Sequence, residues 1–412
     1  MRTDQSLIIK NATIIDGIGE QPYIGSVFIN NKRIEKINSE KINIPVDKVI
    51  DASGMFLLPG IIDCHVHVMM NQYNLMDHIN TPFSLNFYNS IHNLETLLLT
   101  GITSARDAGG ADLGVKRALE NKLLKGPKLK ISITPLSITG GHLDAWMPSG
   151  IKLHLLNPPY PGNPEGICDG LPEVRKKVRQ ILRAGADVIK TCSTGGVLSP
   201  TDHPEFTQFS MEELKIMVAE GAMRKGIKVM AHAQGLEGIK NAIKAGVHSI
   251  EHGVMLDNEA IDLMLENNVF LVPTLLAINS VIHGDYSEKT KNKAKAIFET
   301  HQESIAKAYK SGVKIAMGTD SGVMEHGRNL EELELMCNVG LSPMESIMSA
   351  TSIASQCLEI NKETGNIEEG KIADLLLVKE NPLTNISSLA NKDNIKVILQ
   401  EGEEIKNTIQ YG

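Results

Sequence analysis

The chain has 412 residues and a formal net charge of −8 at pH 7, with 42% hydrophobic and 22% charged residues. This length exceeds the size at which one hydrophobic core usually stops growing, so two domains or one large barrel are expected. The acidic balance argues against nucleic acid or a membrane as a partner, and no apolar run is long enough to cross a bilayer. The N-terminus has no secretory signal, and the five cysteines lack Cys-x-x-Cys spacing, which predicts a cytoplasmic protein without disulfides.

Both ends of the chain read as short β-strands. Residues 7–58 contain strand-like runs separated by turn residues such as Asp16-Gly17. The same texture returns near the C-terminus in GNIEEGKIADLLLVKENPL and NIKVILQEGEEIK. Because two β-rich ends enclose a different middle, we expect residues 1–58 and 360–412 to form one small composite β-sandwich domain.

The middle of the chain, residues 59–359, alternates between strand-like and helical patterns, and several of the helical patterns end on glycine, as a C-cap should. The eight strand-like runs are residues 60–68, 101–109, 128–138, 186–193, 228–234, 248–254, 269–276 and 313–321. Eight strand–helix units predict an α/β fold of the (β/α)8 TIM-barrel type. An open doubly wound sheet is the alternative, but no G-x-G-x-x-G motif follows the first strand. The long irregular stretch 140–170 is expected to be a functional loop.

Metal-binding side chains fall at the ends of these predicted strands. His65 and His67 are two residues apart, so both rings project from the same face of the first strand. Four more candidates end later strands, namely Lys190, His232, His252 and Asp320. A lone His-x-His motif or a terminal aspartate would carry little by itself, because the aspartate often caps a helix. Jointly, four imidazoles and a carboxylate at one barrel mouth predict a site for divalent transition metals, zinc above all.

Lys190 needs an explanation of its own. It ends a strand that is expected to be buried, where an unpaired ammonium costs several kcal/mol. The simplest interpretation is that its side chain reaches solvent beyond the strand end.

Several motifs together resemble the amidohydrolase superfamily over nearly the whole chain. They are LLPGIIDCHVH, IK, AHA, IEHG, GTDSG, MSATSIASQCLEI, TGNIEEGKIADLLLV and NPL. The chain is most similar to the imidazolonepropionase-like branch, which includes Xaa-Pro and Xaa-Arg dipeptidases. The resemblance implies two divalent metal ions, expected to be Zn²⁺, bridged by an N-carboxylated Lys190 and a hydroxide. It further implies that His65, His67 and Asp320 bind the first ion, and that His232 and His252 bind the second.

The resemblance also implies a reaction. We expect a binuclear amidohydrolase that cleaves amide bonds in dipeptides of the Xaa-Pro or Xaa-Arg/Lys type, or in N-acyl amino acids. Asp320 would be catalytic, accepting the hydroxide proton and passing it to the departing amine. A mononuclear deaminase or imidazolone-ring hydrolase would not need Lys190, whereas a lactonase or phosphotriesterase could use the same centre. A non-catalytic scaffold is disfavoured because the ligand set is complete.

Several residues are candidates for contacts with the substrate. His142 opens the long loop and could act as a catalytic electrophile by hydrogen bonding to the substrate carbonyl or carboxylate, or could be an ordinary loop histidine in water. Arg328 is a candidate for the substrate carboxylate, as is Arg106 unless it is structural, because guanidinium binds carboxylate bidentately. Trp146 could wall the pocket or anchor the loop. Gln234 follows AHA, where relatives often carry His or Tyr, and is taken as a substrate contact.

The remaining expectations concern partners and neighbours of the site. The partner is expected to be a small-molecule substrate, and the protein a homo-oligomer. Cys64 and Cys192 each adjoin a ligand on a strand, so they should point away from the site into the core. Asp63 could support a ligand from the second layer or cap its strand.

Overall fold

The computed structural model describes residues 6–38, 45–71, 79–147, 149–154, 156–199 and 202–409. The chain has a mixed α/β fold and divides into two compact units. The first comprises Met1–Asp63, Glu95–Ser104 and Gly327–Gly412, and the second comprises Cys64–Leu94 and Ala105–His326. The domain boundaries expected near residues 58 and 360 stay a prediction.

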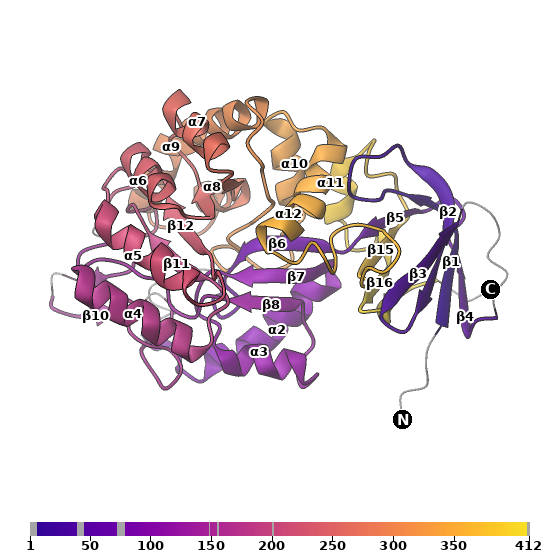
Figure 1. Ribbon diagram of the computed structural model, residues 1–412, viewed down its shortest axis with the longest axis horizontal. Coiled ribbons are helices and arrows are strands. Elements are labelled where there is room, and N and C mark those ends of the chain that lie inside the picture. The colour runs from indigo at the N-terminus through magenta and orange to yellow at the C-terminus, as the bar shows by residue number, and fades with distance from the viewer. Residues whose placement is uncertain are drawn as a thin grey trace. The chain divides into compact units, whose positions relative to one another are not determined.

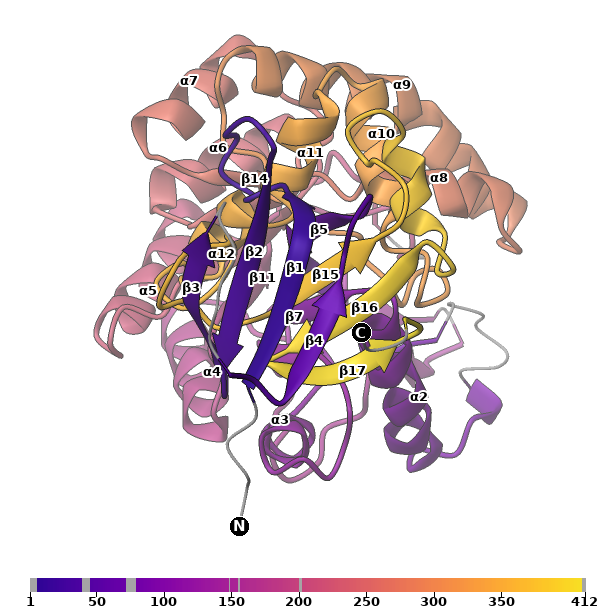
Figure 2. The ribbon, with the colours of Figure 1, turned by 90° about the vertical axis from the view of Figure 1, so that its right-hand side faces the viewer.

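The first unit is built on one eight-stranded sheet. Its strands are β1 (Ser6–Ile14), β2 (Tyr23–Asn30), β3 (Arg33–Asn38), β4 (Lys48–Asp51), β5 (Phe56–Pro59), β15 (Leu375–Val378), β16 (Ile395–Gln400) and β17 (Glu403–Asn407). The order is β17-β16-β15-β5-β1-β2-β3, with β4 also paired to β1. Because β15 pairs antiparallel with β5, strands from both ends of the chain share this sheet (Figure 2). The eight described strands that lie wholly in this unit belong to a single sheet, and the predicted sandwich stays a prediction.

Apolar residues pack on both faces of this sheet. Leu7 and Ile9 of β1, and Leu375 and Leu377 of β15, belong to one buried cluster. Residues two apart in a strand face the same side, so these four lie on one face, and the buried Ile8 and Leu376 lie on the other. The helices that lie wholly in this unit are α10 (Glu331–Asn338), α11 (Pro343–Ser349), α12 (Ser352–Cys357) and the 3-10 helix Ile386–Ala390.

Two further sheets carry the strands that were expected to form a barrel. One contains β6 (Ile61–Val66), β7 (Ile102–Asp107) and β8 (Lys128–Ile131), and the other is the parallel sheet β11 (Ile189–Cys192), β12 (Val229–Ala233), β13 (Ser249–His252) and β14 (Phe270–Val272). Seven of the eight predicted strands therefore form. Residues 313–321 form isolated parallel bridges instead, from Ile315 to Leu271 and from Ser321 to Val66. A closed eight-stranded barrel stays a prediction.

Helices alternate with these strands. They are α2 (Leu85–Leu99), α3 (Leu113–Glu120), α4 (Leu171–Ala184), α5 (Met211–Ala222), α6 (Leu236–Ala245), α7 (Asn258–Glu266), α8 (Leu275–His283) and α9 (Glu288–Lys310). Helices α4 to α7 contact one another in chain order beside β11 and β12 (Figure 1). As expected from the sequence, α4 and α6 end on Gly185 and Gly246 in the left-handed conformation, which glycine adopts without strain. Within the described residues, no helix has the length and apolar character needed to span a membrane.

Strand register brings the predicted ligands together. In the parallel sheet, Cys192 lies opposite His232, and Ala233 lies opposite His252. The carboxyl ends of parallel strands lie at the same edge of a sheet. His232 and His252 therefore lie at neighbouring strand ends, and Lys190, opposite Met230, lies on the adjoining strand β11, although as many as 62 residues separate the three in the chain (252 − 190).

Candidate metal centre

Three predicted ligands form a compact cluster. One Asp320 carboxylate oxygen, Oδ1, lies 3.3 Å from His65 Nε2 and 3.2 Å from His67 Nε2. Possible ligand atoms of these three residues all lie within 4.8 Å of one another. Two imidazoles and a carboxylate are a usual ligand set for zinc and similar divalent ions.

The other three predicted ligands adjoin this cluster. Lys190 Nζ lies 3.4 Å from His65 Nε2, and the ring centroids of His65 and His252 are 5.2 Å apart. The His252 ring lies 4.6 Å from that of His232. Lys190 is only 4% exposed, which rules out the interpretation that its side chain reaches solvent. All six residues line one cavity.

The second nitrogen of each imidazole contacts the protein, and for His65, His67 and His232 this contact fixes which nitrogen is free for a metal. The contacts are His65 Nδ1 to Glu251 Oε2 (2.7 Å), His67 Nδ1 to the Gly109 carbonyl (2.8 Å), His232 Nε2 to the Gly195 carbonyl (2.9 Å) and His252 Nδ1 to Thr274 Oγ1 (2.7 Å). Carboxylate and carbonyl oxygens only accept, so the nitrogen facing them carries the proton. The opposite nitrogen then keeps its lone pair for a metal, as in other metal-binding histidines. These residues therefore fit divalent ions.

Glu251 is a supporting residue that the sequence interpretation missed. Its side chain is fully buried between His65 and Arg106, whose Nη2 donates to Glu251 Oε1 at 2.9 Å. Burial by itself would raise the pKa of Glu251, but the Arg106 guanidinium and the His65 hydrogen bond hold it well below its usual range. Arg106 also donates through Nε to the Cys64 carbonyl at 2.7 Å, so it has the structural role and not the substrate-binding one. The signal for Glu251 was a charged residue within the buried strand SIEH, the same signal that pointed to Lys190.

Burial also changes the chemistry of Lys190. It lowers the pKa of the ammonium group, while the nearby Glu251 and Asp320 carboxylates act in the opposite direction. The neutral amine is the form that can react with carbon dioxide to give an N-carboxylated lysine. The cavity therefore favours the reactive form of this side chain.

The backbone is strained where the site is built. His252, Thr274 and Asp320 have positive φ angles of 72°, 51° and 58°. Residues other than glycine rarely adopt this left-handed conformation, and it persists only where the surrounding structure enforces it. Two predicted ligands and the hydroxyl that orients one of them are therefore held in unusual backbone conformations, as is common at functional sites.

Residues 56–405 of the sequence match the amidohydrolase family. The chain belongs to the amidohydrolase family. It is 33% identical to ochratoxinase of Aspergillus niger, an alignment covering 97% of this chain and 86% of that protein. A solved Xaa-Pro dipeptidase with bound methionine is 34% identical, with a TM-score of 0.89 and coverage of 97% and 99% of the two chains. A solved prolidase complexed with N-methylphosphonate-L-proline is 32% identical, with a TM-score of 0.90 and coverage of 98% and 100%.

These similarities confirm two predictions made from the motifs. The first is membership of the superfamily and of its imidazolonepropionase-like branch, since imidazolonepropionases also match over most of the chain. The second is that the protein is a hydrolase of carbon–nitrogen bonds.

Two of the four predicted substrate contacts, His142 and Gln234, line the cavity with the metal ligands. The His142 ring stacks on that of His232, with centroids 4.1 Å apart and planes at 19°. A Cβ atom on Gly196 would lie 2.3 Å from His142 Cε1, so only glycine fits beside this ring. The small residues after Lys190, expected to leave room for substrate, therefore also make room for His142. Gln234 is 5% exposed, and its Oε1 has no hydrogen-bond partner among the described residues.

The other two predicted substrate contacts, Arg328 and Trp146, are not among the residues that line the cavity. Arg328 belongs to the first compact unit, where its Nε and Nη2 donate to Glu331 at 2.9 and 2.6 Å. Trp146, expected as a pocket wall, is 51% exposed in the two-residue strand β9 (Ala145–Trp146), which pairs with β10 (Lys152–Leu153). Loop 140–170 contributes His142, Leu143 and Leu156 to the lining instead.

The residues beside the ligands are buried. Cys64 and Cys192 are 0% and 1% exposed, which confirms that both belong to the core. Burial raises the pKa of the Cys192 thiol to about 12, so it stays protonated and unreactive. Asp63 is fully buried and accepts a hydrogen bond from Asn329 Nδ2 at 2.8 Å.

A Thr274→Val substitution tests the orienting contacts directly. Valine keeps the shape of threonine but has no hydroxyl to form the hydrogen bond with His252 Nδ1. Loss of such an outer contact typically weakens metal affinity by about 10- to 100-fold, and we expect this result in metal titrations. Thr100→Val is the matched control, because the Thr100 hydroxyl is also buried but donates to the Leu97 carbonyl. Equal metal affinity of the two variants would contradict the assigned role of Thr274.

Proposed function

We propose that the protein is a binuclear metal-dependent amidohydrolase on a (β/α)8 barrel. His65, His67 and Asp320 would hold one divalent ion, His232 and His252 a second, and N-carboxylated Lys190 would bridge them, with Zn²⁺ the expected metal. The observation that carries the proposal is the buried Lys190 amine, 3.4 Å from His65 Nε2, in a cavity lined by all the other predicted ligands. When bound, the ions would polarise the scissile carbonyl and lower the pKa of a water molecule towards about 7.

Asp320 would move the proton during the reaction. Burial would raise the pKa of its carboxyl group, but His65 and His67 hold it well below its usual range. The carboxylate is therefore ionised and can accept the proton of the attacking water. It can then give that proton to the departing nitrogen, which completes general acid–base catalysis with one residue.

The cavity wall favours an apolar group on the substrate. The apolar lining residues are Met70, Ala108, Pro135, Leu143, Leu156, Val197, Leu198, Ala277, Ile278, Val281 and Val323. Asp144, which the sequence suggested for a basic substrate, accepts from the Gly140 amide at 2.8 Å and lies 3.8 Å from Lys152 Nζ. It does not line the cavity. We therefore favour dipeptides with an apolar or proline-like group, or N-acyl amino acids with apolar side chains, over Xaa-Arg/Lys dipeptides.

The similar proteins support this choice of substrate. A prolidase, a Xaa-Pro dipeptidase and an ochratoxinase all match over nearly the whole chain at 32–34% identity. Two of these names, prolidase and Xaa-Pro dipeptidase, denote hydrolysis of a peptide bond at proline. The direct test is a hydrolysis screen of apolar dipeptides and N-acyl amino acids with metal-loaded protein. Preferential cleavage of lactones, phosphotriesters or cyclic amides would favour the alternative hydrolases.

Amidation of the substrate C-terminus is expected to slow hydrolysis. Among the described residues that line the cavity, Lys190 is the only lysine or arginine, so the Gln234 amide is left to donate to a substrate carboxylate, and the His142 ring contacts the substrate as well. A hydrogen bond to a charged group is worth about 1.5–3 kcal/mol, which is roughly 10- to 100-fold in kcat/KM. The measurement compares free and amidated forms of the same apolar dipeptide. Equal kcat/KM values would show that no carboxylate is recognised.

A homo-oligomeric state and a cytoplasmic location stay predictions.

A further inference from the structure

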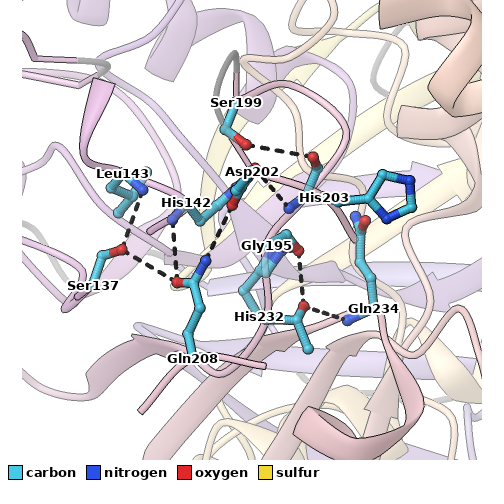
Figure 3. Close-up of polar contacts among 12 residues, drawn as sticks. Ser137, His142, Leu143, Gly195, Ser199, Asp202, His203, Gln208, His232 and Gln234 are labelled. Atoms are coloured by element: carbon cyan, nitrogen blue, oxygen red, sulfur yellow. Dashed lines mark hydrogen bonds and ion pairs between the residues drawn. The ribbon is translucent and has the colours of Figure 1, made fainter. Parts of the chain in front are cut away.

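A polar network of Ser137, Gln208 and Asp202 adjoins His142 (Figure 3). His142 Nδ1 is buried and has no hydrogen-bond partner among the described residues, but it faces Asp202 Oδ2 at 3.7 Å. Asp202 is itself buried. An imidazole nitrogen with only a carboxylate in front of it is expected to carry the proton, because a lone pair there would face a negative charge.

Hydrogen bonds to the side chain of Asp202 hold its carboxylate in place. Gln208 Nε2 donates to Asp202 Oδ2 at 3.1 Å, and the Gly196 amide donates to Oδ1 at 3.4 Å. The same Gln208 accepts the His142 backbone amide through Oε1 at 3.1 Å. Gln208 therefore ties the backbone of His142 to the carboxylate that faces its ring.

The backbone of Asp202 is fixed as well. Lys293 of α9 donates to the carbonyls of Asp202 and Ser199 at 2.8 and 2.9 Å. On the other side, the His142 ring is confined by its stack on His232 and by the missing side chain of Gly196. Ring and carboxylate thus have little freedom to separate, and a small shift would close the 3.7 Å gap to a hydrogen bond.

We propose that Asp202 is the positioning residue of His142. Its carboxylate keeps the ring proton on Nδ1, so that Nε2 can accept a hydrogen bond from an N–H group of the substrate. This inference rests on the proposed function, in which His142 contacts the substrate. The logic is that of other histidines whose orientation and tautomer are set by a carboxylate at the far nitrogen. Asp202 does not touch the substrate and acts only through the ring.

The tautomer can be measured without any turnover. Zn²⁺-loaded protein labelled with ¹⁵N-histidine is examined by long-range ¹H–¹⁵N NMR, with the His142 signals assigned from a His142→Gln variant. We expect the Nδ1–H tautomer in the wild type and the Nε2–H tautomer in Asp202→Leu, which removes the charge at similar volume. An Nε2–H tautomer in the wild type would overturn the proposal, and this wild-type measurement decides it even if the variant does not fold. Because no substrate is needed, failure here is distinct from failure of the proposed function.

A double-mutant cycle separates positioning from structural support. Asp202→Asn is expected to lower kcat about 10- to 100-fold on the best substrate of the screen, with KM and metal content unchanged. In the His142→Ala background, the same substitution should have no further effect, because the ring through which Asp202 acts is gone. An equal loss in both backgrounds would show that Asp202 only supports its loop, and would overturn the proposal.

Discussion

Lys190→Ala is expected to lose bound metal and all measurable turnover. Lys190 is 4% exposed and lies among the predicted ligands, with its Nζ 3.4 Å from His65 Nε2. The predicted ligands in this cavity are four neutral imidazoles and one carboxylate, so they offer a single negative charge. N-carboxylated Lys190 would add a second negative charge to balance the positive charge of two divalent ions. Without it, we expect fewer than two ions per chain by elemental analysis, together with loss of hydrolysis of the best substrate.

Two further measurements make this expectation specific. Lys240→Ala is the matched control, because Lys240 is also mostly buried but pairs with Asp257 and Glu259 on the next helix. A short carboxylic acid added to Lys190→Ala should restore part of the activity by filling the space of the missing group. In the wild type, ¹³C-bicarbonate should give one lysine carbamate NMR signal that the variant lacks. Full metal content and normal turnover in Lys190→Ala would remove the bridging assignment.

Asp320→Asn is expected to reduce kcat by about 100-fold or more. Asparagine keeps the size of the side chain and one oxygen, but it cannot accept the proton that Asp320 would carry between water and the leaving nitrogen. The loss should appear mainly in kcat and less in KM, because the proton is transferred only in the chemical step. Asp320 Oδ1 also contacts His65 and His67, so metal content must be measured on the same sample.

Metal loading distinguishes the two roles of Asp320. If the variant holds as much metal as the wild type and is still slow, the lost function is proton transfer. Asp374→Asn serves as the control for loss of a buried carboxylate, because Asp374 bonds to Thr364 and the Glu401 amide in the β-rich unit. A fully loaded Asp320→Asn enzyme with the wild-type kcat across the pH range would exclude the shuttle role.

The six ligand candidates were accessible from the sequence for a local reason. Each one lies in or at the end of a strand-like run, and such runs can be recognised from their apolar residues. The strand period of two then predicts which neighbours share a face, as for His65 and His67, and which do not, as for Cys64. The structure places all six around one cavity.

The supporting contacts could not be derived in this way because they join distant segments. Glu251 orients His65 across 186 positions of sequence, and Thr274 orients His252 across 22. Arg328 looked like a free guanidinium, but Glu331, three residues later at the start of α10, binds it in a bidentate pair. Trp146 lies in a short two-stranded pairing, which the sequence of residues 140–170 does not predict.

By itself, the sequence determined the alternation of strands and helices, the residues at the strand ends and hence the chemistry of the ligand set. These properties depend on local patterns of apolar, polar and glycine residues, which can be read along the chain. Only the tertiary structure decided which imidazole nitrogens are free, that Arg106 supports Glu251, and that His142 stacks on His232 in front of Asp202. Those properties depend on side chains from different strands and loops meeting at distances of a few ångströms, and packing of the whole unit sets those distances.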